Sequence, residues 1–214
     1  MSELLTPKVI LILKTMSKDL SRWYYTRELA KLSRVGVGTV SSEFNKLAKE
    51  GLVEQKREGQ EKYYKLNLTS PRTRKLCELF EIDKSEKLYK EKRRLAWVLE
   101  DFTKKVSDFA PEIQSIILFG SVARGEATPR SDIDILVITP NSEEERFNEL
   151  MNAVDRLAAE VSGRYPAKLV LIVMMTKDFE KNVKDKKRFA ADVLKDGIVL
   201  FGQERYYHML SRVV

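Results

Sequence analysis

Residues 116–138 read IILFGSVARGEATPRSDIDILVI, two apolar runs of strand length joined by a short polar connection. The second run begins with Asp132 and Asp134, one residue apart. A strand alternates its side chains, so both carboxylates project from one face while Ile133 and Ile135 enter the core. Two carboxylates this close repel each other, and a divalent cation is the usual compensation. The pair therefore predicts a Mg²⁺ site, because hard oxygen ligands suit Mg²⁺ held together with substrate phosphates.

The connection between the two runs carries Gly120 and Ser121. Gly120 lets the backbone turn sharply and approach a ligand closely. Ser121 is placed to cap a short helix over 122–125, whose free N–H groups would face an anion. The alternative is a hairpin-like connection with a capped turn and a solvated, acidic strand start. Arg124 and Gly125, together with two aspartates at this spacing, favour the phosphate and metal site.

The motif residues Gly120-Ser121-x-x-Arg124-Gly125 and Ser131-Asp132-x-Asp134 resemble the signature of the DNA polymerase beta-type nucleotidyltransferase superfamily. The resemblance is closest to the small "minimal nucleotidyltransferase" domains, and it covers roughly residues 85–205. It is specific because the glycines, the serine, the arginine and both aspartates match at once. The segment 196–202, DGIVLFG, is similar to the closing strand of that domain.

This resemblance implies an enzyme that transfers a nucleoside monophosphate from an NTP to an acceptor hydroxyl, with pyrophosphate leaving. It also implies a two-metal Mg²⁺ site, in which the ions clamp the attacking and leaving oxygens. Asp132 and Asp134 would be the catalytic residues that hold the metal, and Gly120 and Ser121 would bind the β- and γ-phosphates. Arg124 would either reach a phosphate or pair with a nearby carboxylate and hold the loop.

The sequence departs from the superfamily at a third carboxylate, which such enzymes usually place on a neighbouring strand to complete the site that activates the nucleophile. The matching strand, 167–173, is AKLVLIV and carries no acid, and Lys168 or Val170 stands near the expected position. Two carboxylates suffice to bind Mg²⁺ and NTP, so nucleotide binding is better supported than turnover. The acids that would substitute for the third carboxylate are Glu126, Glu160 and Asp178.

Residues 5–80 follow the order helix, helix, turn, helix, hairpin, with helices expected over 5–16, 27–32 and 39–50 and strands over 52–57 and 62–66. This order resembles the winged helix-turn-helix modules of bacterial and archaeal transcription regulators. In such modules the third helix enters the major groove of double-stranded DNA and the hairpin lies along the backbone or minor groove. The candidate DNA-binding residues are Arg34, Ser41, Ser42, Asn45, Lys46, Lys49, Lys56, Arg57 and Lys62.

The charge of the chain is uneven. Its 214 residues carry a net charge of +7, and residues 1–90 hold all of this excess, with 19 Lys and Arg against 12 Asp and Glu. Such a basic segment is expected where a protein meets a polyanion. The alternative is a winged helix that contacts another protein and has an ordinary solvated basic face.

Other features bound the location of the protein. No apolar run is long enough to span a membrane, and the first residues, Met-Ser-Glu, lack the features of a signal peptide. The single cysteine, Cys77, excludes an internal disulfide. We therefore expect a cytoplasmic protein with no membrane partner.

These patterns predict an α+β chain of two domains, a winged helix-turn-helix domain over 1–82 and a nucleotidyltransferase domain with a small mixed sheet over 83–214. A long helix over 83–110 would link them, and its apolar seam would lie on the sheet or against a second chain. The seam consists of residues spaced by seven: Leu88, Leu95, Phe102 and Phe109. Winged modules often read two half-sites as dimers, which predicts a homodimer. Further helices are expected over 143–161 and 178–194, and further strands over 168–175 and 198–201.

Three functions are compatible with these patterns. The first is a DNA-binding regulator with an active transferase domain that modifies a partner protein, in the manner of antitoxin-type minimal nucleotidyltransferases. The second is a catalytically weak domain that senses nucleotide and changes DNA affinity by binding two states differently. The third is a scaffold without turnover, in which nucleotide binding is vestigial.

Overall fold

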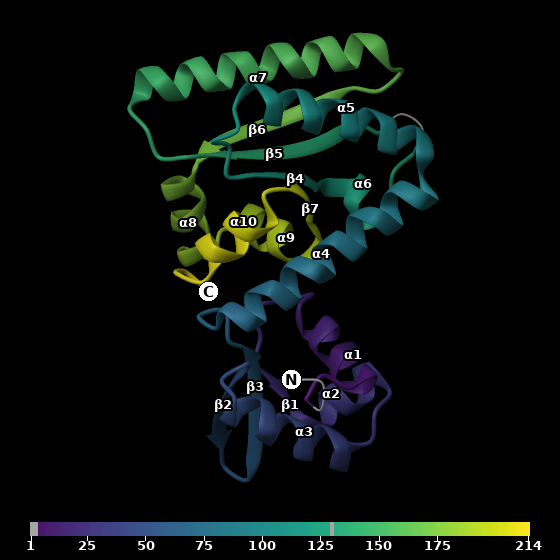
Figure 1. Ribbon diagram of the computed structural model, residues 1–214, viewed down its shortest axis with the longest axis vertical. Coiled ribbons are helices and arrows are strands. Elements are labelled where there is room, and N and C mark those ends of the chain that lie inside the picture. The colour runs from purple at the N-terminus through teal and green to yellow at the C-terminus, as the bar shows by residue number, and fades with distance from the viewer. Residues whose placement is uncertain (1–3, 129–130) are drawn as a thin grey trace. The chain divides into compact units, whose positions relative to one another are not determined.

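The computed structural model describes residues 4–128 and 131–214. Residues 1–3, on which the expectation about the N-terminus rested, and Pro129 and Arg130 of the signature stretch lie outside the described residues. The chain folds into two compact units, Met1–Phe80 with Val214, and Glu81–Val213. Figure 1 labels the helices and strands of both units. No helix among the described residues combines the length and the apolar character needed to cross a membrane.

The described residues of the first unit form three complete helices, the beginning of a fourth, and a three-stranded antiparallel sheet in the order β1-β3-β2 (Figure 1). The sequence order of helices and hairpin is the expected one, with boundaries moved by a few residues at most. Strands β2 and β3 pair along their whole length, from Val53 opposite Leu66 to Glu58 opposite Glu61. The elements are α1 (Pro7–Met16), β1 (Tyr24–Tyr25), α2 (Thr26–Ser33), α3 (Val37–Lys49), β2 (Val53–Glu58) and β3 (Glu61–Leu66).

Local chemistry accounts for these boundaries. The Thr6 side chain accepts a hydrogen bond from the Val9 N–H and caps α1, and Pro7 occupies the first turn, where its missing N–H costs nothing. Helix α3 buries Phe44, whose ring packs edge-on against Tyr64 of β3, with 5.1 Å between ring centroids. That pair joins helix and sheet in the core of the first unit.

The sequence predicted one long helix over 83–110, and this prediction was wrong. The structure has two helices, α4 (Pro71–Glu91) and α5 (Arg93–Phe109), separated at Lys92, whose φ of −127° and ψ of 64° are not helical. A straight helix over 83–110 would be roughly 42 Å long, whereas a strand of seven residues spans roughly 23 Å. The break lets Leu88 of α4 and Phe102 of α5 enter one core beside the sheet.

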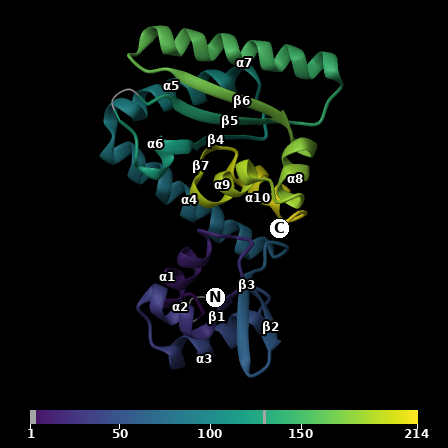
Figure 2. The same ribbon diagram turned by 180° about the vertical axis from the view of Figure 1, so that it is seen from behind.

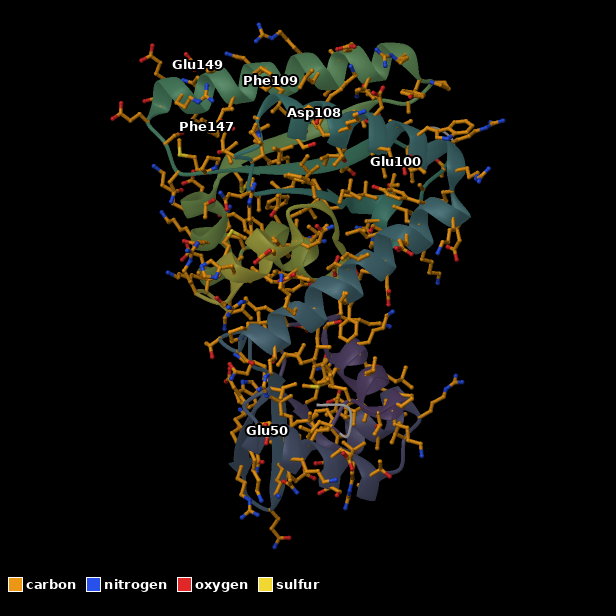
Figure 3. All side chains as sticks on the ribbon, in the orientation of Figure 1. Glu50, Glu100, Asp108, Phe109, Phe147 and Glu149 are labelled. Carbon is orange, nitrogen blue, oxygen red and sulfur yellow. The ribbon has the colours of Figure 1, made fainter. Side chains whose placement is uncertain are left out.

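The apolar seam predicted for this helix also ends early. Phe109, its last member, is 55% exposed at the end of α5, and Figure 3 labels it together with Glu100 and Asp108 of the same helix. The buried positions of α5 are Ala96, Val98, Leu99, Phe102 and Val106. They recur every three or four residues, as expected for one face of a helix that lies on a sheet.

The second unit is built on a four-stranded mixed sheet in the order β6-β5-β4-β7. Strand β4 is antiparallel to both β5 and β7, whereas β5 and β6 are parallel. The small mixed sheet expected from the sequence is therefore confirmed. Its strands are β4 (Ser115–Phe119), β5 (Ile133–Thr139), β6 (Leu169–Met175) and β7 (Ile198–Phe201).

Helices cover both faces of this sheet (Figures 1 and 2). On one face, α5 and α7 (Glu144–Arg164) pack over alternate strand residues, among them Leu118, Ile135 and Val137, in a single buried cluster. Alternation turns Ile117 and Leu136, which are also fully buried, to the opposite face. That face is met by α8 (Thr176–Lys184), α9 (Arg188–Asp196) and α10 (Gln203–Leu210).

Two of these helices replace the single helix expected over 178–194. The chain turns between α8 and α9 at Lys186, which adopts a left-handed conformation with φ of 52°. Lys187 donates its backbone N–H to the Asn182 carbonyl at 2.9 Å, closing the turn. Two short helices bury both Phe179 and Ala190, since each can take its own direction across the sheet.

Candidate nucleotide site at the end of strands β4 and β5

The two motifs of the signature stretch meet at one end of the antiparallel pair β4–β5. Phe119, the last residue of β4, lies opposite Asp134 of β5 in the strand register. Gly120 then begins α6 (Gly120–Arg124), and Asp132 immediately precedes β5. The pairing brings the Gly-Ser and the two aspartates together, as the sequence indicated. The neighbours Ile133 and Ile135 are buried in the core, as the alternation predicted.

Gly120 is required here by a close approach. Its φ is +71°, and a Cβ added to it would stand 2.1 Å from Oδ2 of Asp134. The carboxylate of Asp134 thus lies directly over the Gly120 backbone, in space that any other residue would fill. Both the turn and this contact need the missing side chain. The strand end therefore holds the carboxylate against the start of α6.

Ser121 does not cap a helix, contrary to the prediction from the sequence. Helix α6 begins at Gly120, its N-cap position is Phe119, and no side chain caps it. Ser121 lies in the first turn, and its carbonyl accepts the Glu126 N–H at 2.9 Å. The left-handed φ of Gly120 lets the chain leave β4 and enter the helix two residues earlier than a serine cap would allow.

Burial and like charge raise the pKa of the Asp134 carboxyl. Burial is the larger cause and the neighbouring Asp132 carboxylate adds to it, while Arg124 acts in the opposite direction. A half-buried carboxylate beside a second one is costly to ionise, and a bound cation relieves that cost. The electrostatics of the site thus favour a positive ligand.

Arg124 pairs with a carboxylate in this structure. Its Nε donates to Oε2 of Glu126 at 2.7 Å, and this hydrogen bond raises the pKa of the guanidinium. Asp192 and Asp196 of α9 add weaker attraction. The pair is exposed to solvent, so little energy holds it. Of the two roles expected for Arg124, the structure contains the carboxylate pair.

Lys168 stands beside Asp132 where a third carboxylate was sought. Its Nζ lies 3.2 Å from Oδ2 of Asp132. One residue further along β6, Val170 is the register partner of Asp134. Both positions next to the aspartates therefore lack an acid. The sequence had pointed to Lys168 and Val170 but gave no sign that the lysine forms an ion pair.

The three acids considered as substitutes have other surroundings. Glu160 of α7 accepts hydrogen bonds from Lys105 and Arg164, and Glu126 pairs with Arg124. Asp178 lies in the first turn of α8. Across residues 4–128 and 131–214, no cluster of three or more His, Cys, Asp and Glu side chains is arranged for a metal ion. Two neighbouring carboxylates, of which Asp134 has a raised pKa, fit one cation that takes its remaining ligands from a nucleotide; they do not fit a second.

Phe189 of α9 is a neighbour of the site that the sequence analysis missed. Its ring meets that of Phe119 edge-on, with centroids 5.4 Å apart. The contact supports the residue from which the chain turns into Gly120. The two rings lie 70 positions apart in the sequence, and no local pattern pairs them. The contact between Phe119 and Phe189 can be predicted only when α9 is known to pack beside the end of β4.

The candidate DNA-binding residues lie on α3, at the end of α2 and on the hairpin of the first unit. Asn45 is turned toward the hairpin, where its Oδ1 accepts hydrogen bonds from Lys62 Nζ at 2.8 Å and Tyr64 OH at 3.4 Å. Lys46 pairs with Glu43 and Lys56 with Glu58. Arg34, Ser42, Lys49 and Arg57 are exposed, and Ser41 is half-buried. Asn45 and Lys62 thus support each other and are less available to a ligand than the sequence suggested.

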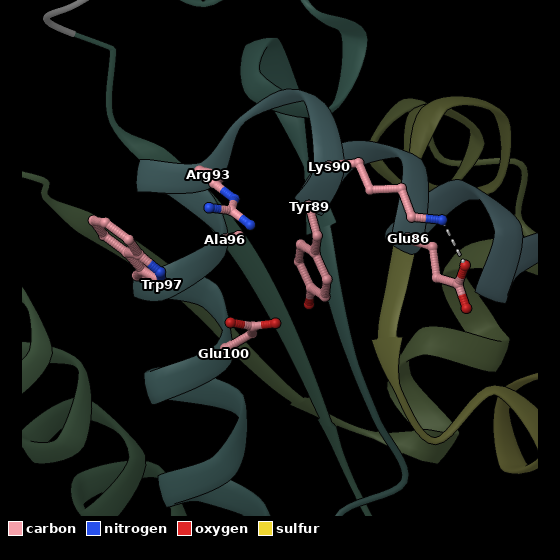
Figure 4. Close-up of a pocket in the computed structure, with 7 residues that line it drawn as sticks. All are labelled: Glu86, Tyr89, Lys90, Arg93, Ala96, Trp97 and Glu100. Carbon is pink, nitrogen blue, oxygen red and sulfur yellow. Dashed lines mark hydrogen bonds and ion pairs between the residues drawn. The ribbon is translucent and has the colours of Figure 1, made fainter.

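A separate hollow of about 480 Å³ lies at the junction of α4 and α5 (Figure 4). Trp97 lines it with 56% of its surface exposed. Tyr89 also lines it, and burial, with a smaller effect of Glu100, raises the pKa of that phenol to about 12. None of the residues expected to bind nucleotide or metal lines this hollow.

The family model described as "Nucleotidyltransferase domain" matches residues 98–199. This part of the chain is a nucleotidyltransferase domain. The match runs from α5 to β7 and includes α6 and both aspartates. It supports the enzyme class expected from the sequence, a nucleotidyltransferase. Residues 1–97 lie outside the match.

Two proteins of Methanocaldococcus jannaschii, each named "Putative protein adenylyltransferase", are similar to part of this chain. One is 28% identical over 118 residues, which are 54% of this chain and 78% of that protein. The other is 41% identical over 54 residues, 25% of this chain and 54% of that protein. A solved structure titled "putative nucleotidyltransferase", from Sulfolobus solfataricus, aligns with 21% identity over 56% of this chain and 86% of its own, with a TM-score of 0.34.

Proposed function

We propose that the nucleotidyltransferase domain binds an NTP with Mg²⁺ and transfers its nucleoside monophosphate to a hydroxyl group of a protein. The observation that carries the proposal is the approach of the Asp134 carboxylate to Gly120, 2.1 Å from a notional Cβ, at the point where β4 turns into α6. The names of the two Methanocaldococcus jannaschii relatives favour ATP as donor and a protein as acceptor.

Each residue of the site has a role in this proposal. Asp132 and Asp134 hold the ion, and Gly120 and Ser121 receive the β- and γ-phosphates against backbone N–H groups at the start of α6. Arg124 exchanges its exposed contact with Glu126 for a phosphate oxygen. When bound, Mg²⁺ would neutralise the negative charge that builds up on the phosphates in the reaction. The acceptor oxygen bonds to the α-phosphorus, pyrophosphate leaves with the electrons of the broken bond, and the hydroxyl proton is released.

Transfer is tested with nucleotides labelled at the α-phosphate. The protein is incubated with Mg²⁺ and labelled ATP, GTP, CTP or UTP, alone and with a lysate of candidate acceptors. We expect label on protein in the wild type and none in Asp132→Ala/Asp134→Ala. Asp108→Asn, an exposed change on α5 (Figure 3), is the matched control and keeps its activity. Equal labelling by the wild type and the double variant would refute the proposal.

We further propose that the first unit is a winged helix-turn-helix module that binds double-stranded DNA. The specific observation is that α3 exposes Lys46 and Lys49 on the side away from its buried Val40, Phe44 and Leu47. A basic helix face beside a hairpin suits the major groove and the flanking phosphates. The uneven charge of the chain supports the same ligand.

Charge reversal tests this second function. Lys46→Glu/Lys49→Glu should abolish the shift of a mixed-sequence duplex in a low-salt gel. Lys8→Glu/Lys18→Glu changes the net charge equally at exposed positions near α1 and should leave most of the binding. If both double variants lose binding to the same degree, only net charge matters and the α3 assignment is wrong. If neither loses binding, the first unit contacts something other than DNA.

Two further expectations belong to this proposal. A homodimer would place two basic helices on two half-sites of a duplex, and light scattering after gel filtration measures the mass that decides it. A nucleotide-sensing regulator would show DNA affinity that depends on NTP and Mg²⁺. Gel shifts with and without nucleotide separate that regulator from one whose two units act independently.

A further inference from the structure

The environment of the two aspartates on the β6 side is set by strand register. Ile133 of β5 pairs with Leu169 of β6, and Asp134 pairs with Val170. Asp132 precedes Ile133 and Lys168 precedes Leu169, so the same alignment places Asp132 beside Lys168. The Ile133 N–H donates to the Lys168 carbonyl at 2.8 Å. The backbone of Lys168 is therefore fixed next to the first aspartate, and its side chain starts from the same edge of the sheet.

The lysine uses this position to neutralise Asp132. Its Nζ lies 3.2 Å from Oδ2 of Asp132. Asp134, by contrast, faces the isopropyl group of Val170, which offers a metal no ligand. The two aspartates and their neighbours on β6 thus comprise two carboxylates and one ammonium group. The two carboxylates carry enough negative charge for one divalent cation, and the Lys168 ammonium group offsets part of that charge.

A second metal ion would have to occupy the same space as this ammonium group. Paired catalytic ions lie about 3.5–4 Å apart and share carboxylate ligands. The ammonium group, 3.2 Å from Oδ2 of Asp132, fills the space beside that oxygen, where a second ion sharing the carboxylate would bind. Like charges so close repel each other. Lys168 and a second divalent ion are therefore alternatives.

We propose that Lys168 takes the place of the second metal ion, so that this site binds one divalent ion per nucleotide, with the lysine supplying the other positive charge. The inference rests on the proposed function, since it assumes that Asp132 and Asp134 hold a metal with an NTP. The Lys168 side chain is 71% exposed. Its long, flexible stem lets the ammonium group reach a phosphate oxygen beside Asp132 while the backbone stays anchored.

The number of bound ions tests the inference directly. Full-length protein is mixed with an ATP analogue that carries a methylene group between the α- and β-phosphorus atoms, and Mn²⁺ is titrated under electron paramagnetic resonance. We expect one Mn²⁺ per chain in the wild type and in Lys168→Arg, with the six-line spectrum of an isolated ion. Lys168→Asp supplies a third carboxylate in place of the cation, and we expect two ions with a spin-coupled spectrum.

The outcomes separate the inference from the function on which it rests. Two coupled ions in the wild type, or a single ion in a folded Lys168→Asp variant, would overturn the inference. Lys168→Met is the second variant: loss of the cation should raise Mn²⁺ affinity several-fold, and unchanged affinity would also overturn it. If the wild type retains no more Mn²⁺ than Asp132→Ala/Asp134→Ala, the proposed nucleotide site itself is wrong.

Discussion

Replacing Gly120 by alanine should damage ligand binding more than folding. At Gly120 the new Cβ would stand 2.1 Å from Oδ2 of Asp134, and real Cβ contacts essentially never fall below 3.0 Å. The carboxylate must therefore retreat by about 1 Å, which a short side chain achieves by rotation. Gly125 provides a matched control, because it has a similar φ of +77° but nothing within 4 Å of a notional Cβ.

The two variants share one cost and differ in another. A residue with a Cβ loses about 1–2 kcal/mol in the left-handed region, so Gly120→Ala and Gly125→Ala should both lower the free energy of unfolding by that amount. Only Gly120→Ala also displaces the Asp134 carboxylate. We expect its affinity for Mg²⁺ and ATP to fall at least about tenfold, which corresponds to about 1.4 kcal/mol, while Gly125→Ala stays within about threefold of the wild type.

The assay exploits the two tryptophans of the chain, Trp23 in the first unit and Trp97 in the second. In a Trp23→Phe background, fluorescence during urea unfolding reports on the second unit, where both glycines lie. Calorimetry with Mg²⁺ and the non-transferable ATP analogue then gives the affinity of each variant. Equal affinity in Gly120→Ala and Gly125→Ala would refute the claim that the glycine makes room for the carboxylate.

Three further predictions concern the second unit. Because the folded state raises the pKa of Asp134, ionisation of this carboxyl destabilises the fold as pH rises from the ordinary carboxyl pKa through the raised one. Asp134→Asn should therefore be more stable than the wild type at neutral pH. The difference between their free energies of urea unfolding should vanish at acid pH, where the carboxyl is neutral. Glu81→Ala should lower the free energy of unfolding, measured by thermal unfolding, by about 3–5 kcal/mol. This buried carboxylate accepts hydrogen bonds from Val199 N–H, Tyr207 OH and Lys84. The control Glu86→Ala, at an exposed position, should change the free energy of unfolding by less than about 0.5 kcal/mol. Phe102→Ala should cost about 3–5 kcal/mol in urea unfolding, since the ring is fully buried between α5 and the sheet; a loss below about 1 kcal/mol would contradict that packing.

Local patterns in the sequence predicted much of the structure of the second unit. Strict alternation through Ile133, Asp134 and Ile135 placed one face in the core and the other at the site, and the final strand, 198–201, has the predicted bounds. The sequence did not predict the helix breaks at Lys92 and Lys186. Neither residue is a glycine or proline, and the surrounding helical pattern continues through both. Tertiary packing on a short sheet, which no local window contains, bends the chain at these points.

The site shows the same division between local and distant causes. Gly120, Asp132 and Asp134 lie within fifteen positions of one another, and their chemistry could be read from spacing alone. The ion pair of Lys168 with Asp132 joins residues 36 positions apart and depends on the register of β5 and β6. The supporting ring of Phe189 is more distant still. Residue type and spacing predict the candidate ligands, whereas the residues that surround them can be identified only from the fold.

The buried carboxylate of Glu81 has a consequence for dissecting the protein. Its hydrogen-bond partners Val199 and Tyr207 belong to β7 and α10, near the other end of the second unit. A fragment trimmed to the family match at 98–199 would lack Glu81, Leu88 and all of α10. The apolar face of the sheet that these residues cover would then be exposed to solvent and to other chains, and the fragment would tend to aggregate. The smallest piece worth expressing therefore begins before Glu81 and extends past Leu210.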